Sequence, residues 1–433
     1  MRRTFAVPVL ALLAAALWLG GCNQPQGTEV SVKLINQWGT PATATVIYQV
    51  GDGAWKLAAQ KDYGEYSFVV PPGETRYGVS VNCLPAGSLL STFGFFTTYQ
   101  LTTNDTTAVT VSCLNFSDQR FTDATINWDV SAVGGDRLRT VTAVDDSSDA
   151  TSPDTVGAIA GLQQPFLFLA YATDYSFGNL KGVRFGRYDV DAYDSYNVTF
   201  AASDAPTLGS VSGPATPTGF SDCSLDAVFA TPEGLMADEL ADGGGSPCSG
   251  SFVKVPGAGS NDVYAVQANY QDTLNDRSLV SAVFPEAAGI GNVTLPALPS
   301  PWPTSYSVTP AALPTFDLDH PDADATGYMI FFMADTASGG PPTFWQIFVS
   351  PDWLGNATSY TLPDLSSAPD FGGLKPLSGD EAMWQVAAFF SDQPIGDWLS
   401  STRWITTGGL IGMPVVPGAH MTAASISNNF TVP

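Results

Sequence analysis

The stretch YAVQANY, residues 264–270, carries the pattern that decides the fold. Tyr264, Val266, Ala268 and Tyr270 occupy alternate positions in it, and side chains at alternate positions of a β-strand lie on one face. Residues 278–284 add a second apolar run shortly afterwards. The two runs predict a pair of neighbouring β-strands.

Strand patterns of this type recur along the whole chain. Val46, Tyr48 and Val50 alternate near its start, and residues 166–172 form a continuous apolar run typical of a buried strand. The 42 Gly and 32 Pro interrupt every candidate helix before it reaches three turns. The sequence therefore predicts an all-β protein, built from about four β-sandwich modules in series.

The first residues have the layout of an export signal. Arg2 and Arg3 precede an apolar run over residues 5–19. That run is about 15 residues long, shorter than the roughly 20 that a membrane-spanning helix needs. It ends in LGGC, residues 19–22, which resembles the lipobox of bacterial lipoproteins.

The resemblance implies a lipid anchor. Residues 1–21 would be removed as the signal peptide, Cys22 would receive the lipid, and residues 22–27 would form a short lipidated tether. Several acyl chains on one cysteine hold a protein to a bilayer nearly permanently, at roughly 0.8 kcal/mol per buried methylene. We expect the protein in the bacterial cell envelope, and Asn23 is compatible with the outer membrane or the cell surface.

The negative charge of the chain argues against nucleic acid and anionic lipid headgroups as partners. Removal of residues 1–21 leaves 14 basic and 41 acidic residues, a formal charge of −27. Such a charge opposes binding to nucleic acid and to anionic lipid headgroups. The expected membrane contact is therefore the lipid itself, and the expected partners are an envelope protein or a polysaccharide.

Four cysteines remain when Cys22 is assigned to lipid, an even number in an oxidising compartment. Three pairings are possible. Pairing within the predicted modules favours Cys83 with Cys113 and Cys223 with Cys248, and the phase of the flanking strands places the first two on core-facing sides. No CxxC motif is present, and the chain holds only two histidines, so we assign no metal site to the cysteines.

Composition changes mark the expected boundaries of the modules. Residues 203–221 are rich in Ser, Thr, Pro and Gly, and residues 297–303 are rich in Pro. The predicted divisions are a first sandwich at 28–116, a second at 118–202, a linker at 203–221, a third sandwich at 222–296, a proline-rich linker at 297–303, and a fourth sandwich at 304–433.

Two of these segments resemble known module families. Residues 118–202 are similar in strand spacing to immunoglobulin-like and carboxypeptidase-regulatory-like domains. The phrase ATGY at 325–328, followed by the apolar run 329–333, resembles the second strand of fibronectin type III-like domains. Asp317 and Leu318 replace the usual tryptophan after Phe316, so no binding residue is transferred from that family.

Two clusters of carboxylates invite a calcium interpretation, because calcium sites use alternate acidic residues. Neither has the order of a calcium-binding loop, and solvated turns explain both, so no metal and no cofactor is assigned. The clusters are Asp317, Asp319, His320, Asp322 and Asp324, and Asp189, Asp191 and Asp194.

Catalytic motifs are missing from the sequence. No G-x-S-x-G, H-E-x-x-H, phosphate-binding or dinucleotide-binding motif is present, and His320 and His420 are the only histidines. We therefore assign no catalytic residue. A glycosidase remains open, because its two carboxylates can come from distant strands.

Tryptophans are concentrated in the last predicted sandwich. Most lie in strand-like runs, where core packing is expected. Trp353 and Trp398 lie in Gly-, Asp- and Pro-rich surroundings and are the two considered for ligand binding at the surface, although packing under a loop is the favoured interpretation for both. The sequence thus predicts a lipid-anchored, non-catalytic structural or interaction scaffold; the alternatives are a glycan-binding surface module using these aromatics and a carboxylate-dependent glycosidase.

Overall fold

The computed structural model describes residues 27–36, 39–83, 94–113, 120–335, 342–368, 370–371, 375–401, 404–405 and 413–433. This part of the chain is almost entirely β-structure, and the predicted all-β class is confirmed. Its helices are α2 (Pro351–Leu354), α3 (Ile395–Ser400) and three 3-10 turns, η1 (Ser131–Val133), η2 (Phe177–Asn179) and η3 (Ala202–Asp204).

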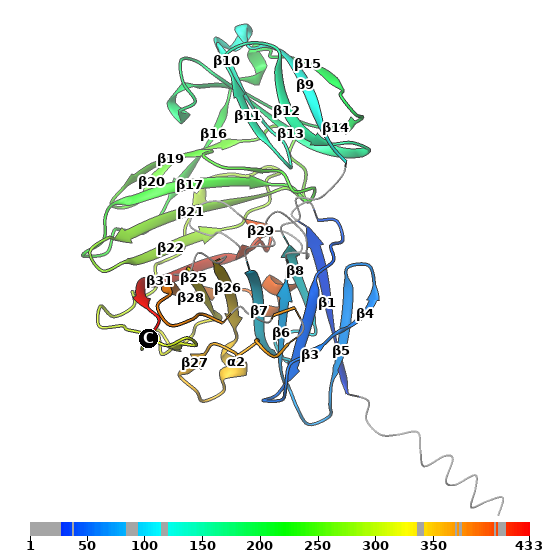
Figure 1. The fold of residues 1–433 in the computed structure, drawn as a ribbon. Coiled ribbons are helices and arrows are strands. Elements are labelled where there is room, and N and C mark those ends of the chain that lie inside the picture. Colours follow the sequence, from blue (N-terminus) through cyan, green and yellow to red (C-terminus); the bar gives the residue numbers. More distant parts are fainter. Residues whose placement is uncertain are drawn as a thin grey trace, which may run out of the picture.

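One sheet of 16 strands, called the long sheet below, crosses the molecule (Figure 1). Its strands come from both halves of the chain. In spatial order they are β23 (Val293–Thr294), β16 (Thr207–Ser212), β20 (Ser249–Lys254), β19 (Ala241–Gly245), β17 (Cys223–Ala230), β21 (Val263–Asp272), β22 (Arg277–Val283), β31 (His420–Thr431), β28 (Glu381–Ser391), β25 (Gly327–Asp335), β26 (Thr343–Val349), β7 (Gly94–Thr102), β6 (Arg76–Asn82), β2 (Thr45–Val50) and β3 (Lys56–Leu57), with β18 (Met236–Ala237) beside β17.

Strand pairing is continuous where the predicted third, fourth and first sandwiches meet. β31 pairs antiparallel with β22 on one side and with β28 on the other. β26 pairs in parallel with β7, from Thr343 opposite Gly94 to Val349 opposite Gln100. Backbone hydrogen bonds therefore connect these three segments directly, in addition to the linkers between them.

A four-stranded sheet covers the β2, β6 and β7 end of the long sheet. Its order is β4 (Ala59–Asp62), β5 (Glu65–Val70), β1 (Thr28–Asn36) and β8 (Ala108–Cys113). Apolar side chains of both sheets, among them Val32, Val79 and Val109, share one buried cluster. Helix α3 lies against the edge strand β8, where the Thr110 hydroxyl donates to the Ser400 carbonyl at 3.2 Å. The helix thereby covers a strand edge that would otherwise be open.

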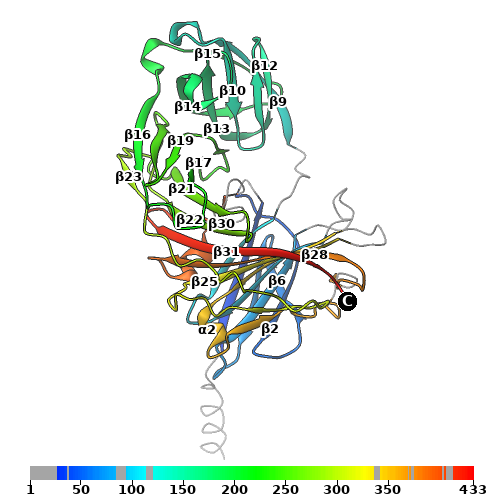
Figure 2. The ribbon, with the colours of Figure 1, turned by 90° about the vertical axis from the view of Figure 1, so that its left-hand side faces the viewer.

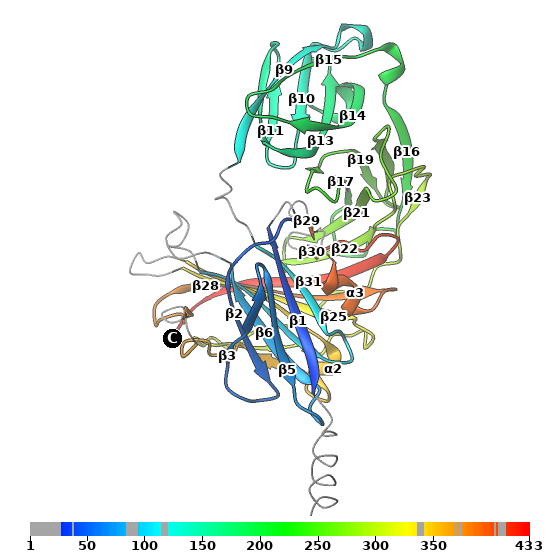
Figure 3. The ribbon, with the colours of Figure 1, turned by 90° about the vertical axis from the view of Figure 1, so that its right-hand side faces the viewer.

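The second sandwich has its own two sheets and lies at one end of the molecule, beside β16, β17 and β19 (Figures 2 and 3). One of its sheets runs β11 (Asp146–Asp149), β10 (Arg137–Val141), β13 (Leu162–Tyr171) and β14 (Leu180–Val190); the other runs β12 (Asp154–Ile159), β9 (Phe121–Asp129) and β15 (Ser195–Thr199). Ile126, Leu138, Phe166 and Phe168 lie in the core between them. The chain enters this sandwich after β8 and leaves it into β16.

Two short ladders complete the fold. β24 (Thr315–Asp317) pairs with β27 (Ser359–Thr361), and β29 (Trp404–Ile405) pairs with β30 (Met413–Pro414). β25 (Gly327–Asp335) contains the run 329–333 that the sequence predicted as a strand of the last sandwich.

Part of the predicted linker at 203–221 is a strand, which corrects that prediction for residues 207–212. They form β16, which pairs antiparallel with β20 and in parallel with β23. Gly209 and Val211 alternate as buried residues there, a strand pattern that the Ser and Gly content of the segment obscured. The boundaries of the predicted modules otherwise stay a prediction.

Both predicted disulfides are present. Cys83, directly after β6, is bonded to Cys113 at the end of β8, with 5.0 Å between their Cα atoms. This bond joins the two sheets of the first sandwich, as the phase of the strands predicted. Cys223 at the start of β17 is bonded to Cys248, directly before β20, with 5.8 Å between Cα atoms.

Candidate functional site: the junction of the second sandwich

The second sandwich rests on the long sheet through the outer face of sheet β11-β10-β13-β14. Along β13, Phe166 and Phe168 point into the core of the sandwich, whereas Leu167 and Leu169 belong to the buried cluster of the long sheet. This explains the continuous apolar run over 166–172. Both faces of the strand are buried, so apolar residues occupy successive positions and do not alternate with polar ones. We call this contact, with the charged residues described next, the junction.

Aromatic rings make direct contact across the junction. Phe185 of β14 meets Phe229 of β17 edge to face, with ring centroids 5.3 Å apart and an interplanar angle of 85°. Phe229 in turn lies 5.4 Å from the ring of Tyr264 on β21. Phe229 and Tyr264 are fully buried, so the junction is dry at its centre.

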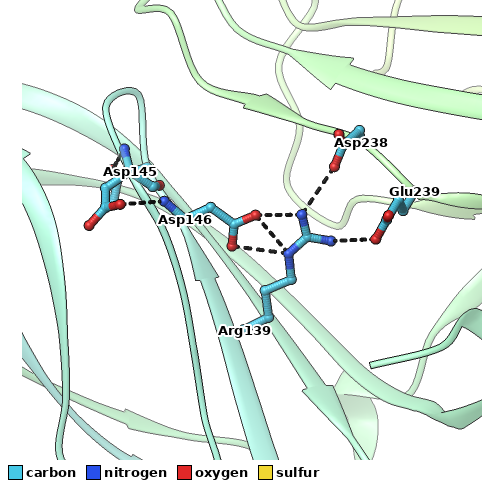
Figure 4. A network of polar contacts seen from close by, with 6 residues as sticks. Arg139, Asp145, Asp146, Asp238 and Glu239 are labelled. Atoms are coloured by element: carbon cyan, nitrogen blue, oxygen red, sulfur yellow. Dashed lines mark hydrogen bonds and ion pairs between the residues drawn. The ribbon is translucent and has the colours of Figure 1, made fainter. Parts of the chain in front are cut away.

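Arg139 of β10 forms the first polar contact of the junction (Figure 4). Its guanidinium donates to both carboxylate oxygens of Asp146 on neighbouring β11, from Nε at 3.0 and 2.9 Å. It also reaches across to Asp238 at 3.0 Å and to Glu239 at 3.3 Å, which follow β18. Only 11% of the Arg139 side chain is exposed, so three carboxylates surround a nearly buried cation.

Backbone strain supports this placement. Glu239 has a φ of 58°, in the left-handed region that few residues other than glycine adopt. Strained backbone of this kind persists where the surrounding structure determines it strongly. The strained residue is Glu239, whose carboxylate is the third acidic partner of the Arg139 guanidinium.

Arg187 of β14 forms the second polar contact. Its Nη2 donates to Asp262 at 2.6 Å, and its Nε and Nη2 donate to the two oxygens of Glu233 at 3.1 and 3.2 Å. The side chain of Asp262, directly before β21, is 0% exposed, and its other oxygen accepts the Gly259 N–H at 2.7 Å. This carboxylate is therefore buried, paired and hydrogen-bonded.

The electrostatics of the junction follow from these contacts. Burial lowers the pKa of Arg139 and of Arg187, but the hydrogen bonds and charges of their carboxylate partners outweigh it and leave both raised. Burial likewise raises the pKa of Glu233, and Arg187 outweighs it, so the pKa of Glu233 lies below 4.5. Arg139, Arg187 and Glu233 are charged at neutral pH, and each guanidinium is matched by more than one carboxylate.

Sequence reasoning missed Arg139 and Arg187. A signal was present, because six of the 14 basic residues that follow residue 21 fall between 118 and 202. Each of the two arginines also lies within a strand, Arg139 in β10 and Arg187 in β14. A cation in such a setting needs a buried partner, which the sequence alone did not identify.

Trp398, one of the two candidates for ligand binding at the surface, is buried. It is 1% exposed, its ring meets that of Phe284 edge to face at 5.3 Å, and its Nε1 donates to the Ser391 hydroxyl at 3.0 Å. The surface role considered for Trp398 is therefore wrong. Its Gly- and Asp-rich surroundings form α3, whose inner face packs against the sheet.

Trp353, the other candidate, is half-buried at the end of α2. Its ring lies 5.7 Å from the ring of Tyr360, and the Arg76 guanidinium lies 5.9 Å from its centroid. Part of its face is thus already occupied by a cation. The two candidates lie on different helices and form no common platform.

The acidic clusters are engaged in local hydrogen bonds. Asp322 accepts the Ser300 N–H and hydroxyl at 2.6 and 2.8 Å, and Asp194 accepts the Tyr196 hydroxyl at 3.0 Å. Among the described residues, no group of three or more His, Cys, Asp or Glu is placed to hold a metal ion. Cys22 and the rest of the predicted tether up to residue 26 lie outside the described residues.

One hollow opens beside the fourth segment, away from the junction. Phe96, Trp345, Leu365 and Phe371 line it, and Lys375, paired with Asp364, lies at its rim. The hollow is too narrow to admit a water molecule. In the part of the chain that the structure describes, no helix is both long enough and apolar enough to cross a membrane.

No known family model and no curated protein sequence matches this chain. Among solved structures, the Bacillus anthracis TIE protein is 9% identical over 62% of this chain and 50% of its own length, with a TM-score of 0.17. A streptococcal ancillary pilin is 9% identical over 55% of this chain and 89% of its own, with a TM-score of 0.15. A tetra-tandem repeat from the extending region of a large adhesion protein is 10% identical over 94% and 99%, with a TM-score of 0.14. TM-scores this low carry no argument about function.

Proposed function

We propose that the mature chain is a lipid-anchored, non-catalytic scaffold of the bacterial cell envelope that holds its second sandwich in a fixed orientation. The junction carries this proposal. An acidic protein places two of its few arginines at the contact between the second sandwich and the long sheet and pairs both with more than one carboxylate. Such an arrangement fixes geometry and leaves no free group for chemistry.

The long sheet supports the same role. It joins the first, third and fourth segments by backbone pairing, so these segments cannot rotate about their linkers without breaking strands. Immunoglobulin-like and fibronectin type III-like modules, the families that the sequence resembles, present loops and edges on a stiff framework.

The anchor is part of the proposal and rests on the sequence. The apolar run 5–19 and the LGGC phrase at 19–22 support lipidation of Cys22 and a place at the outer membrane or cell surface. The proposed partner is an envelope protein or polysaccharide. Glycan binding through Trp353 and Trp398 is not favoured, because one ring is buried and the other lies under Arg76.

Distance measurement between two spin labels tests the fixed orientation. Tyr193 of the second sandwich is 80% exposed and Leu274 in the β21–β22 turn is 92% exposed, so cysteines at these positions accept labels without disturbing a core. A single narrow distance distribution in the mature protein is expected. A broad distribution, equal to that of the same protein with both Arg139 and Arg187 changed to Met, would contradict the scaffold role, as would turnover of glycosides, esters or peptides.

A further inference from the structure

The proline-rich segment 296–303, called the strap below, lies across β22 and β31. The Ser281 hydroxyl of β22 donates to the Pro296 carbonyl at 2.7 Å. The Trp302 indole N–H donates to the Ala424 carbonyl of β31 at 2.9 Å, and Arg277 of β22 donates to the Trp302 carbonyl at 2.8 Å. Trp302 is 1% exposed, so the strap contributes a large ring to the core.

His320 contacts the strap through the ring of Trp302. Its ring stands edge to face with Trp302, with centroids 4.7 Å apart and an interplanar angle of 87°, and its centroid lies 5.3 Å from that of Phe390 on β28. The residue is 4% exposed. A buried imidazole between two aromatic rings has no water to solvate a positive charge.

The hydrogen bonds around His320 require its neutral form. Nδ1 accepts the Asp322 backbone N–H at 3.1 Å, so the ring proton is on Nε2, which is buried as well. The Asp322 carboxylate in turn accepts the N–H and hydroxyl of Ser300 in the strap. A proton on Nδ1 would break the first of these bonds and loosen the turn that holds Ser300.

We propose that His320 is an acid-sensitive clasp: protonation of its ring expels it from between Trp302 and Phe390 and releases the strap from β22 and β31. This regulation is separate from the junction and does not depend on the scaffold role. It concerns the one histidine of the chain whose neutral ring is built into a core contact.

Charged groups face the clasp from several elements. Burial, the largest influence, lowers the pKa of His320 below 6.5. The charges of Asp322 and Asp324 and the backbone hydrogen bonds to Asp322 and Ser300 act in the raising direction without overcoming it. On the strap side Arg277 is paired with Asp272, and beyond Phe390 the Asp392 carboxylate lies 3.6 Å from His420 Nδ1. The His420 side chain is exposed.

The direction of the effect follows from linkage. Because the pKa of His320 is lower in the closed state than the 6.5 of a free histidine, the stabilisation from the clasp is complete above pH 6.5 and is lost as the pH falls below it. Release of the strap should increase by up to about tenfold between pH 7.5 and 5.5. The increase continues until the pH reaches the lowered pKa of the closed state.

Hydrogen exchange of the mature protein at pH 7.5 and 5.5, corrected for intrinsic rates, measures release in peptides that cover the strap. Faster exchange at pH 5.5, by up to about tenfold, is expected for the wild type. His320→Asn keeps an acceptor near the position of Nδ1 but cannot be protonated, and it should abolish the acid response. His420→Asn is the matched control and should leave it unchanged.

Direct titration of His320 by NMR keeps the proposal testable if His320→Asn folds poorly. The chain holds only two histidines, and His420→Asn assigns their signals. A titration midpoint below 6.5 for His320 is expected. A midpoint at or above 6.5, an acid response that persists in His320→Asn, or no acid response in the wild type would each overturn the proposal.

Discussion

Replacement of Arg187 by Met should destabilise the junction far more than loss of an ordinary surface ion pair. The change keeps the apolar stem but leaves the carboxylate of Asp262, 0% exposed, with only the Gly259 N–H as partner. Removing one member of a buried pair costs about 3–5 kcal/mol. Arg187 is 26% exposed, so we expect the lower end, about 3 kcal/mol.

Urea denaturation of the mature protein gives the free energy of unfolding from the transition midpoint and slope. Lys61→Met is the matched control, because Lys61 and its partner Glu29 are both about half exposed and such pairs contribute about 0–1 kcal/mol. Addition of Asp262→Asn to Arg187→Met should restore part of the loss by removing the uncompensated charge. Equal losses for Arg187→Met and Lys61→Met, with no recovery in the double variant, would refute this view of the junction.

Four further outcomes are expected. Cys22→Ser should release the protein from membranes; a wild-type protein without an acyl chain by mass spectrometry would disprove the anchor. Replacement of Cys83 and Cys113 by Ala should lower the unfolding free energy by about 3–4 kcal/mol in thermal or urea denaturation. Trp398→Ala should cost about 3–5 kcal/mol of stability, as for other buried aromatic residues, and should leave any affinity for sugars unchanged in a binding titration. Stability in urea should fall with pH below 4.5, because the folded-state pKa of Glu233 is lowered and its contribution is lost as the pH falls through that pKa; Glu233→Gln should flatten this dependence.

Local patterns in the sequence predicted strands and disulfides well, because both depend on residues that are close in the chain or in phase along a strand. The alternation at 264–270 is β21, and the continuous run 166–172 is the strand buried on both faces. The pairing of Cys83 with Cys113 followed from their positions on core-facing sides of two strands.

Long-range features could not be predicted in this way. The parallel pairing of β26 with β7 joins residues about 250 positions apart, and the sequence of neither strand indicates which strand it pairs with. A surface role was considered for Trp398 because composition describes the local chain and not what packs on it. Arg139 and Arg187 were missed for the same reason, since the carboxylates that match them lie in another segment.

The position of β31 between β22 and β28 has a consequence for biogenesis. β31 is synthesised after both of its neighbours, yet it pairs with seven residues of one and eleven of the other. Until it arrives, the incomplete chain presents two long unpaired edges, which are sites of aggregation and of attack by proteases. Survival of the newly made protein then depends on how quickly residues 420–431 are delivered, so chaperones should bind the chain most strongly in the interval before that strand appears.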